Sequence, residues 1–503
     1  MALDVDSVQY GPWRTVRYDV PVEDCAKDEI FEMSNARIGT GGEVRIRQGT
    51  ASYSDASAIG GTPTLNLAVE FKPDVSNTHV VIAAGNALYR YSSGWSAITG
   101  STTITAGDGN TFEWADANGT LVITNGVDND AIKWTGTGNA ATLDDDGRFT
   151  KGKHIAWFDN RLWIGNVNGA TNKLWYSDIA DIETWGATSF FIFGGIIRAL
   201  VPTQNALTVH TTDGIYTVIP TGNAVNPFIT NQRTGTNQGR PLAAADGRSV
   251  VAIPNDIQLM LLDDGIYEWS GGATLNKISK DLDGRYWYNL NKSRFYQSFA
   301  LYHPDENEVW FMLPYGGSQT KMNHIMVWNT VRQGWHGPYE GFERNCVALI
   351  DGKPHMGDYG GILWDHESGT NDNNNSIPST FETSGQAPYG ADVRVRWQQA
   401  RHFFDGKGAW NVTASQRSAD TAGTTKDVFM SGGGFLLGTD TVGGTATLQP
   451  TRMISQDIGL AGYSPNSSMK ISLNSKDQTY TYRKILMRFK PIGRVSKPKQ
   501  LDD

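Results

Sequence analysis

Acidic side chains form three short clusters that could supply metal ligands or a general acid and base. The clusters are Asp144–Asp146, Asp263–Asp264 and Asp281-x-Asp283-Gly284. The third is a fragment of a calcium-loop pattern, but it lacks the third oxygen ligand and the closing Glu of that pattern. A glycosidase pair is defined by its separation in space, so the sequence leaves that pair open. Because the first two clusters fit loops and hairpin turns, we predict no metal site.

Other catalytic motifs are missing from the sequence. Its nine histidines form no His-x-x-x-His pair, and Cys25 and Cys346 lie far apart, as expected of two reduced, half-buried thiols. There is no Gly-x-Ser-x-Gly elbow, phosphate-binding loop or dinucleotide fingerprint. The string nearest to a sialidase repeat, Ser418 to Thr424, lacks the Trp of that repeat. We therefore predict a protein that is not an enzyme and needs no cofactor.

Cationic side chains are concentrated in three segments, although the whole chain carries a net charge of −9. Glu43-Val-Arg-Ile-Arg47 alternates apolar and charged residues, which is typical of a strand with one basic face. Ala391 to Trp397 has a similar pattern, and the stretch from Arg483 to Lys499 contains no acid. Such segments suit docking to an acidic surface. The predicted interface residues are Arg37, Arg45, Arg47, Arg394, Arg396, Arg483 and Arg488.

A repeated hairpin organises more than half of the chain. Its clearest copies are Leu207 to Tyr216 and Ile257 to Trp269, in which Asp-Gly separates two runs of strand-forming residues. Asp-Gly favours the positive φ angles of a two-residue primed turn, so we expect such turns here.

Seven copies of this hairpin can be aligned on the first apolar residue of the second strand. The mean spacing is about 46 residues, inside the range of roughly 40 to 50 for a four-stranded propeller blade, and the aligned residues are Leu88, Ile132, Leu174, Ile215, Ile266, Val327 and Ile362. A single such unit cannot bury its own apolar face, so the copies must stack around an axis. A non-repeating β-sandwich is the alternative. The preferred fold class is all-β, a β-propeller of about seven blades.

Five segments follow from this pattern. They are an N-terminal arm (1–74) with a short helix over Lys27 to Ala36 and a strand, a propeller (75–370), a linker (371–379), a C-terminal β-sandwich-like region (380–490) and a basic tail (491–503). The arm could close the ring or brace a neighbouring domain. No run of 18 or more apolar residues exists and the start lacks the features of a signal peptide, so synthesis in the cytoplasm without a membrane span is expected.

The chain resembles the tail nozzle, or phage stabilisation, proteins of short-tailed bacteriophages. The resemblance lies in Ala36 to Thr50, in the series of Leu/Ile-Tyr/Trp hairpins and in Phe403 to Trp410. It implies a virion tail protein, assembled in the host cytoplasm, of which about six copies form a ring. Such a ring would extend the DNA ejection channel, contact the adaptor and portal proteins and support fibres or spikes. Double-stranded DNA would pass through the channel without sequence recognition. The net negative charge of the protein would repel the DNA phosphates from the channel wall.

Two other functions remain open. A receptor-binding protein or depolymerase with a propeller fold would bind or cleave glycans, and aromatic loops such as Tyr286-Trp-Tyr288 could stack on sugars. The other is a cytoplasmic propeller scaffold that is unrelated to virions and binds no sugar.

Overall fold

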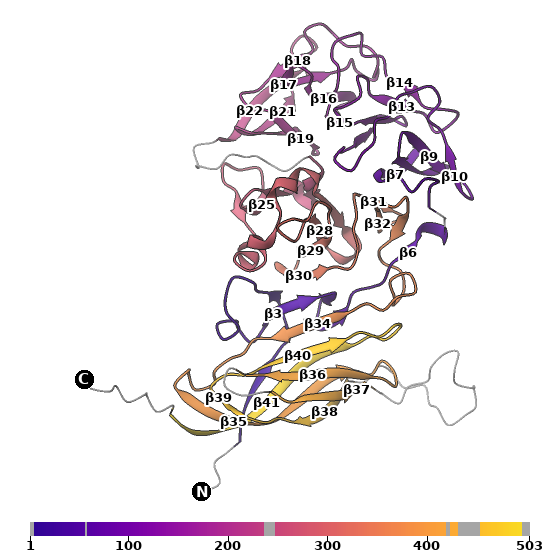
Figure 1. Cartoon of the computed structure of the whole chain (residues 1–503). Coiled ribbons are helices and arrows are strands. Elements are labelled where there is room, and N and C mark those ends of the chain that lie inside the picture. The colour runs from indigo at the N-terminus through magenta and orange to yellow at the C-terminus, as the bar shows by residue number, and fades with distance from the viewer. Residues whose placement is uncertain (1–4, 56–57, 236–246, 419–422, 431–452, 495–503) are drawn as a thin grey trace.

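The computed structural model describes residues 5–55, 58–235, 247–418, 423–430 and 453–494. It contains a seven-bladed β-propeller and a two-sheet β-sandwich, which lie at opposite ends of the molecule in Figure 1. Short 3-10 helices connect some of the strands. They are η1 (Tyr53–Asp55), η3 (Gly247–Ser249), η4 (Pro254–Asp256), η5 (Lys280–Leu282), η6 (Trp287–Asn289), η7 (Lys292–Gln297) and η8 (Pro304–Glu306).

Each of the first four blades is an antiparallel four-stranded sheet. Blade 1 contains β7 (Leu65–Asp74), β8 (Asn77–Ala84), β9 (Ala87–Tyr91) and β10 (Trp95–Ala97). Blade 2 contains β11 (Glu113–Asp116), β12 (Leu121–Thr124), β13 (Ile132–Trp134) and β14 (Ala141–Thr142). Blade 3 contains β15 (His154–Phe158), β16 (Arg161–Val167), β17 (Ala170–Tyr176) and β18 (Phe190–Ile192). Blade 4 contains β19 (Ile197–Pro202), β20 (Leu207–Thr211), β21 (Gly214–Pro220) and β22 (Phe228–Gly235).

The last blade is completed by a strand from the beginning of the chain. Blade 5 contains β23 (Val250–Ile253), β24 (Ile257–Leu262), β25 (Gly265–Trp269) and β26 (Asn276–Lys277), and blade 6 contains β27 (Phe299–His303), β28 (Glu308–Leu313), β29 (His324–Asn329) and β30 (Gly334–Tyr339). Blade 7 contains β31 (Cys346–Ile350), β32 (Lys353–Gly357), β33 (Leu363–Asp365) and β6 (Ala51–Ser52). Because β6 pairs with β33, the two ends of the propeller are joined by backbone hydrogen bonds. A buried cluster also joins blade 7 to blade 1.

The seven aligned hairpin residues confirm the predicted repeat. Six of them lie on the third strand of a blade, from Leu88 on β9 to Val327 on β29, and Ile362 directly precedes β33. The cores lie between neighbouring blades, as in the cluster that joins Val69 and Leu88 to Leu121. The all-β fold with seven four-stranded blades is therefore the fold of the described residues.

The turns of the two clearest hairpins differ from the prediction. The central residues after Leu262 are Asp263 and Asp264, and Gly265 is already paired with Leu262. Neither Asp263 nor Asp264, nor the corresponding Thr212 and Asp213 of the other hairpin, has φ in the left-handed region, so these are not primed turns. At the other hairpin a Cβ on Gly214 would lie 2.2 Å from the main-chain oxygen of Thr234, which favours glycine there.

The sandwich is built from both ends of the chain. One sheet has the order β38-β35-β41-β5-β4, with β1 paired to β41 and β39 paired to β35. Its strands are β1 (Asp6–Tyr10), β4 (Ala36–Ile38), β5 (Val44–Ile46), β35 (Val393–Asp405), β38 (Met453–Gly459), β39 (Tyr463–Ser464) and β41 (Thr481–Arg494). The other sheet has the order β2-β3-β34-β40-β36-β37. Its strands are β2 (Thr15–Val16), β3 (Glu29–Ser34), β34 (Ser379–Thr383), β36 (Asn411–Arg417), β37 (Thr425–Phe429) and β40 (Ser468–Leu473).

The helix expected over Lys27 to Ala36 is wrong, because β3 and β4 occupy that segment. Asn35 has φ of 49°, a left-handed conformation that a helix cannot contain. Ile30 and Met33 of this segment are buried in the sandwich core.

The segment boundaries also differ. The propeller begins with β6 and β7 inside the range assigned to the arm, and β41 extends into the range assigned to the tail. Residues 495–503 of that tail lie outside the described residues.

One continuous core joins the sandwich to blades 5 and 6. It contains Trp397 and Phe489 from one sheet, Phe381 from the other, and Leu259 and Phe311 from the propeller. The two parts are therefore packed together and are not connected by an exposed linker alone.

Candidate functional site

The predicted interface arginines fall into two groups. Arg37, Arg45 and Arg47 lie on or beside β4 and β5, and β4 packs against β30 of blade 6. Arg394, Arg396, Arg483 and Arg488 lie on β35 and β41 in one sheet of the sandwich (Figure 1). The structure does not bring all seven together.

Arg37 is buried inside the chain. Its Nε and Nη2 atoms donate hydrogen bonds to the two carboxylate oxygens of Glu308, at 2.9 and 2.7 Å. Nη1 donates to Glu367 at 3.2 Å, and Glu306 lies 3.3 Å from Nη2. With 2% of its side chain exposed, Arg37 holds β4 against blade 6 and offers no surface to a second molecule.

The charges around Arg37 shift the pKa values of their neighbours. Burial, opposed by Arg37, raises the pKa of Glu367 to about 7. Burial lowers the pKa of His336 to about 4, although Glu308 lies 3.3 Å from its Nε2 atom. These groups form a buried network with more carboxylates than guanidinium groups.

Arg47 is also bound within the chain, whereas Arg45 is more accessible. Arg47 donates to Asp372 at 2.9 and 2.5 Å and to the side-chain oxygen of Asn35 at 2.8 Å. Arg45 lies 3.6 Å from Glu306 and its side chain is 38% exposed. The strand predicted over Glu43 to Arg47 is present as β5, but its cations connect the two parts of this chain.

The other predicted arginines belong to an exposed surface that we call the basic sheet face. It is the outward face of β35 and β41, on which Arg396 pairs with Lys490, and Gln399 pairs with Arg488. The opposite face of these strands is buried, including Trp397 and Met487. The cations of the basic sheet face are Arg394, Arg396, Arg401, Arg483, Lys484, Arg488 and Lys490.

Three carboxylates balance part of this charge. Asp457 on β38 binds Arg401 through two contacts of 2.6 Å. Asp405 binds Arg483 at 3.0 and 2.7 Å, and Glu43 lies 3.6 Å from the same guanidinium. Arg488 donates to the neutral Gln399 at 3.2 Å. Seven cations against three carboxylates make this face positive within a chain of net charge −9.

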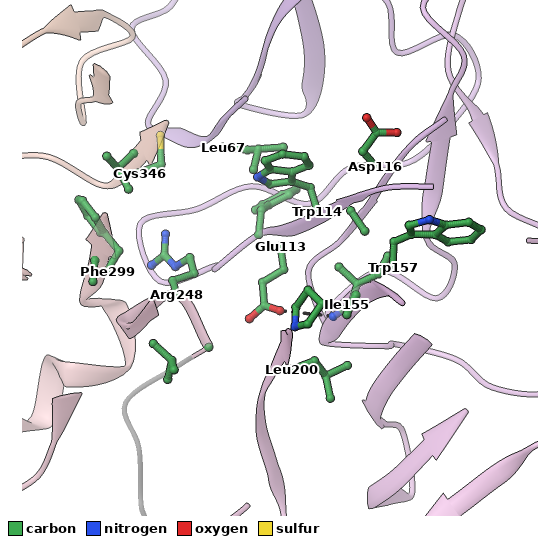
Figure 2. A pocket seen from close by; sticks show the side chains of 18 of the residues that line it. Leu67, Glu113, Trp114, Asp116, Ile155, Trp157, Leu200, Arg248, Phe299 and Cys346 are labelled. Atoms are coloured by element: carbon green, nitrogen blue, oxygen red, sulfur yellow. Dashed lines mark hydrogen bonds between the residues drawn. The ribbon is translucent and has the colours of Figure 1, made fainter. Parts of the chain in front are cut away.

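A separate cavity of about 490 Å³ lies at the propeller axis and is lined by residues from all seven innermost strands. Figure 2 shows Glu113 and Arg248 in this cavity, with the rings of Trp114 and Trp157 and the carboxylate of Asp116. Trp114 is 40% exposed. The predictions from sequence did not include these residues, because only the ring closure brings distant strands to one axis.

The polar groups of this axial cavity mainly brace the strands. Arg248 donates to the main-chain oxygens of Asn345 and Gln297, at 2.8 and 2.9 Å. Glu113 lies 2.8 Å from Nδ1 of His154. The Nε2 atom of His154 is buried and has no partner among the described residues, so this ring presents no nitrogen to the cavity.

The acidic clusters considered in the sequence have structural partners. Asp281 accepts a hydrogen bond from Thr15 at 3.0 Å, and Asp283 binds Lys277 at 2.9 Å. Asp264 accepts from the hydroxyl of Tyr267 at 2.9 Å. Within the described parts of the chain, no group of three or more His, Cys, Asp or Glu residues is arranged to hold a metal ion.

Two further expectations can be compared with the structure. Cys25 and Cys346 are free thiols, and both are buried more completely than expected. In the loop Tyr286-Trp-Tyr288 the first two rings are buried and only Tyr288 is exposed, at 83%. The loop therefore offers one aromatic ring to a ligand.

The described residues include no helix long and apolar enough to cross a membrane. No known protein-family model matches the sequence. The search of curated proteins also found no match.

Several solved structures are similar in fold. The extracellular domain of the one-component system BT4673 from B. thetaiotaomicron is 9% identical, with a TM-score of 0.44 over 75% of this chain and 56% of that chain. The GH74 enzyme of Niastella koreensis is 15% identical, with a TM-score of 0.38 over 61% and 43%. Kluyveromyces lactis Hsv2 is 9% identical, with a TM-score of 0.34 over 64% and 93%. The alignment thus spans about half the length of the first two structures.

Proposed function

We propose that this protein is a structural subunit of a phage tail, a nozzle protein that forms a ring below the adaptor. The ring would extend the DNA ejection channel and support fibres or spikes. The proposal starts from the resemblance of Ala36 to Thr50, the hairpin series and Phe403 to Trp410 to that family. Its role in the virion would be mechanical, without a reaction or a cofactor.

The observation that carries this proposal is the basic sheet face. It is an exposed, cation-rich sheet surface in an otherwise acidic chain, which suits docking to a broad acidic protein surface. The shared core beneath it connects the docking surface to blades 5 and 6. A mechanical force applied to the sandwich would therefore be transmitted to the propeller, as the function of a tail component requires.

Imaging of the purified chain tests the assembly. We expect rings of about six copies, since closed cyclic symmetry is the rule for homo-oligomers. Light scattering would give the mass, and negative-stain images would show the ring, alone or on a purified portal–adaptor complex. A chain that stays monomeric under both conditions contradicts the proposal.

Charge reversal tests the docking surface. The double variant Arg396→Glu, Lys490→Glu should fold normally and lose at least about tenfold in affinity for the portal–adaptor complex, because it replaces attraction with repulsion. The double variant Lys151→Glu, Lys292→Glu makes the same charge change on the propeller and should bind as the wild type does. Equal losses in both variants would show a net-charge effect instead of a docking site.

Binding of double-stranded DNA is a further test, which distinguishes protein docking from DNA binding at the basic sheet face. A wall past which DNA slides should bind DNA weakly and without sequence preference at physiological salt. Tight DNA binding that disappears in the Arg396→Glu, Lys490→Glu variant would assign the basic sheet face to DNA and refute the protein-docking proposal.

A glycan-binding propeller is the second candidate, favoured by the axial cavity. Trp114 and Trp157 present aromatic rings near the carboxylates of Glu113 and Asp116, as Figure 2 shows. Aromatic rings with a few polar groups suit sugar binding. A glycan array and a polysaccharide-cleavage assay separate the candidates: binding that is lost in Trp114→Ala supports the glycan function.

A further inference from the structure

A second cavity, of about 610 Å³, lies where blade 7 is connected to the sandwich. Phe342 and Arg344 come from the segment before β31, and Trp364 comes from β33. Asp372 and Ser376 come from the connection between β33 and β34. This cavity is distinct from the axial cavity and from the basic sheet face.

Arg344 is held rigidly in the wall of this cavity. Its guanidinium carbon lies over two aromatic rings, 4.9 Å from the centre of Phe342 and 5.1 Å from the centre of Trp364. Nε donates to Nε2 of His366 at 2.9 Å, and Nη1 donates to the main-chain oxygen of Glu343 at 3.0 Å. Since the residue is only 5% exposed, its orientation is set by these contacts.

One edge of this guanidinium remains available. Nη2 makes no hydrogen bond within the described parts of the chain, and it is not among the buried polar atoms that lack a partner. Because Arg344 lines the cavity and its Nε and Nη1 atoms already donate within the chain, the Nη2 edge is the part that a ligand can reach.

Arg344 has no close counter-ion among the described residues, since no carboxylate of theirs lies within 4 Å of it. Asp358 and Asp372 attract its charge from a greater distance. Asp372, which lines the same cavity, is bound by both Nη atoms of Arg47 and by the hydroxyl of Thr50. Glu340, another lining residue, lies 3.1 Å from Nε2 of His324 and accepts a hydrogen bond from Ser34. The desolvation of this cation lowers the pKa of Arg344 to about 9.

We propose that this cavity binds a carboxylate, which pairs with the Nη2 edge of Arg344. The N–H groups of a guanidinium lie in its own plane, and a carboxylate matches that planar geometry. A phosphate dianion fits less well, because Glu340 and Asp372 would repel its second charge. The carboxylate comes from a small organic acid or from an Asp or Glu side chain of another polypeptide. This proposal stands independently of the tail function.

Ligand-dependent stability tests the proposal on the full chain. Acetate, compared with chloride at equal ionic strength, should give a saturable rise in the thermal unfolding midpoint, because a ligand that binds the native state stabilises it. Arg344→Gln should weaken acetate binding by at least about tenfold, or about 1.4 kcal/mol. Arg161→Gln is the matched control, since Arg161 also stacks on two rings, Tyr176 and Phe228, but lies outside this cavity.

Ligand-observed NMR on the wild-type protein gives a second test that needs no variant. We expect saturation transfer to acetate that unlabelled succinate displaces and that equimolar phosphate displaces poorly. If Arg344→Gln does not fold, Arg344→Lys keeps the charge without the planar edge and should still weaken binding. No saturation transfer to acetate, or equal displacement by phosphate, would overturn the carboxylate assignment.

A capped glutamate, N-acetyl-Glu-amide, distinguishes the two sources. Binding of succinate without binding of the capped residue indicates a small acid, and binding of the capped residue indicates a side chain from a partner. Failure of acetate, succinate and the capped residue to bind refutes the proposal.

Discussion

Arg37 is a cation whose partners are all far away in sequence. Glu306, Glu308 and Glu367 approach it because β4 packs on blade 6. The alternating charges of the N-terminal segment predicted a strand, and β5 is there. The sequence could not show that acids about 270 to 330 residues away would bury Arg37, since that pairing depends on the folded ring.

Removal of Arg37 should destabilise the protein strongly. Arg37→Ala leaves Glu308 buried without its bidentate partner, so we expect a loss of about 3–5 kcal/mol in the free energy of unfolding. Denaturant unfolding followed by tryptophan fluorescence measures this loss. The control Arg401→Ala breaks an exposed pair with Asp457 and should cost about 0–1 kcal/mol. Similar losses in both variants would contradict a special role for the buried network.

The raised pKa of Glu367 predicts a pH-dependent stability. The native state holds the proton more tightly than the unfolded chain, in which the ordinary value is 4.5. This contribution is therefore complete below pH 4.5 and is lost as the pH rises through about 7. Glu367→Gln should not show this loss. Between pH 5 and pH 8, the free energy of unfolding of the wild type should therefore fall by on the order of 2–3 kcal/mol more than that of Glu367→Gln.

The same titration has a matched control. Glu343→Gln changes an exposed carboxylate that pairs with Lys321 and should leave the pH dependence unchanged. If the unfolding free energies of the wild type and of Glu367→Gln change equally between pH 5 and 8, Glu367 does not titrate in this range.

The blade hairpins are the elements that the sequence predicted best. Six of the seven aligned residues lie on the third strand of a blade and are buried, and Ile362 directly precedes β33. The turn type was predicted wrongly, since Asp-Gly is compatible with more than one geometry. In both clear copies the following Tyr hydroxyl donates to the Asp of the turn, at 2.8 and 2.9 Å.

Close approach explains the glycine of these hairpins and gives a prediction. A Cβ on Gly214 would lie 2.2 Å from the main-chain oxygen of Thr234, so Gly214→Ala must displace β22. We expect a loss of about 1–3 kcal/mol in the free energy of unfolding. Gly272→Ala is the control, because its Cβ would meet nothing within 4 Å, and its effect should stay within about 0.5 kcal/mol. Equal effects at both positions would refute the steric explanation.

The composition of the sandwich could not be predicted from sequence patterns. The late strands were expected to form a region of their own, yet β1 pairs with β41 and β3 pairs with β34. The short segments β1 to β5 carry local signals for strands, but no local signal names a partner more than 300 residues away. At the scale of the whole molecule, the ring was predictable from its repeats and the sandwich was not.

A shared core predicts that the propeller and the sandwich unfold together. The cluster that contains Trp397, Phe381 and Phe311 crosses between them, so loss of either part exposes apolar surface of the other. Calorimetry should show one main transition, and tryptophan fluorescence should change at the same temperature. Two separated transitions, one for each part, would contradict this coupling.

The position of β41 has a consequence for biosynthesis. The propeller, from β6 to β33, is inserted between the two halves of the sandwich, and β41, which joins β35 to β1 and β5, is the last described strand in chain order. Until a ribosome has translated β41, β1 lacks its partner strand and the basic sheet face does not exist. Only a chain translated through β41 can display that surface, so chains that terminate earlier lack it.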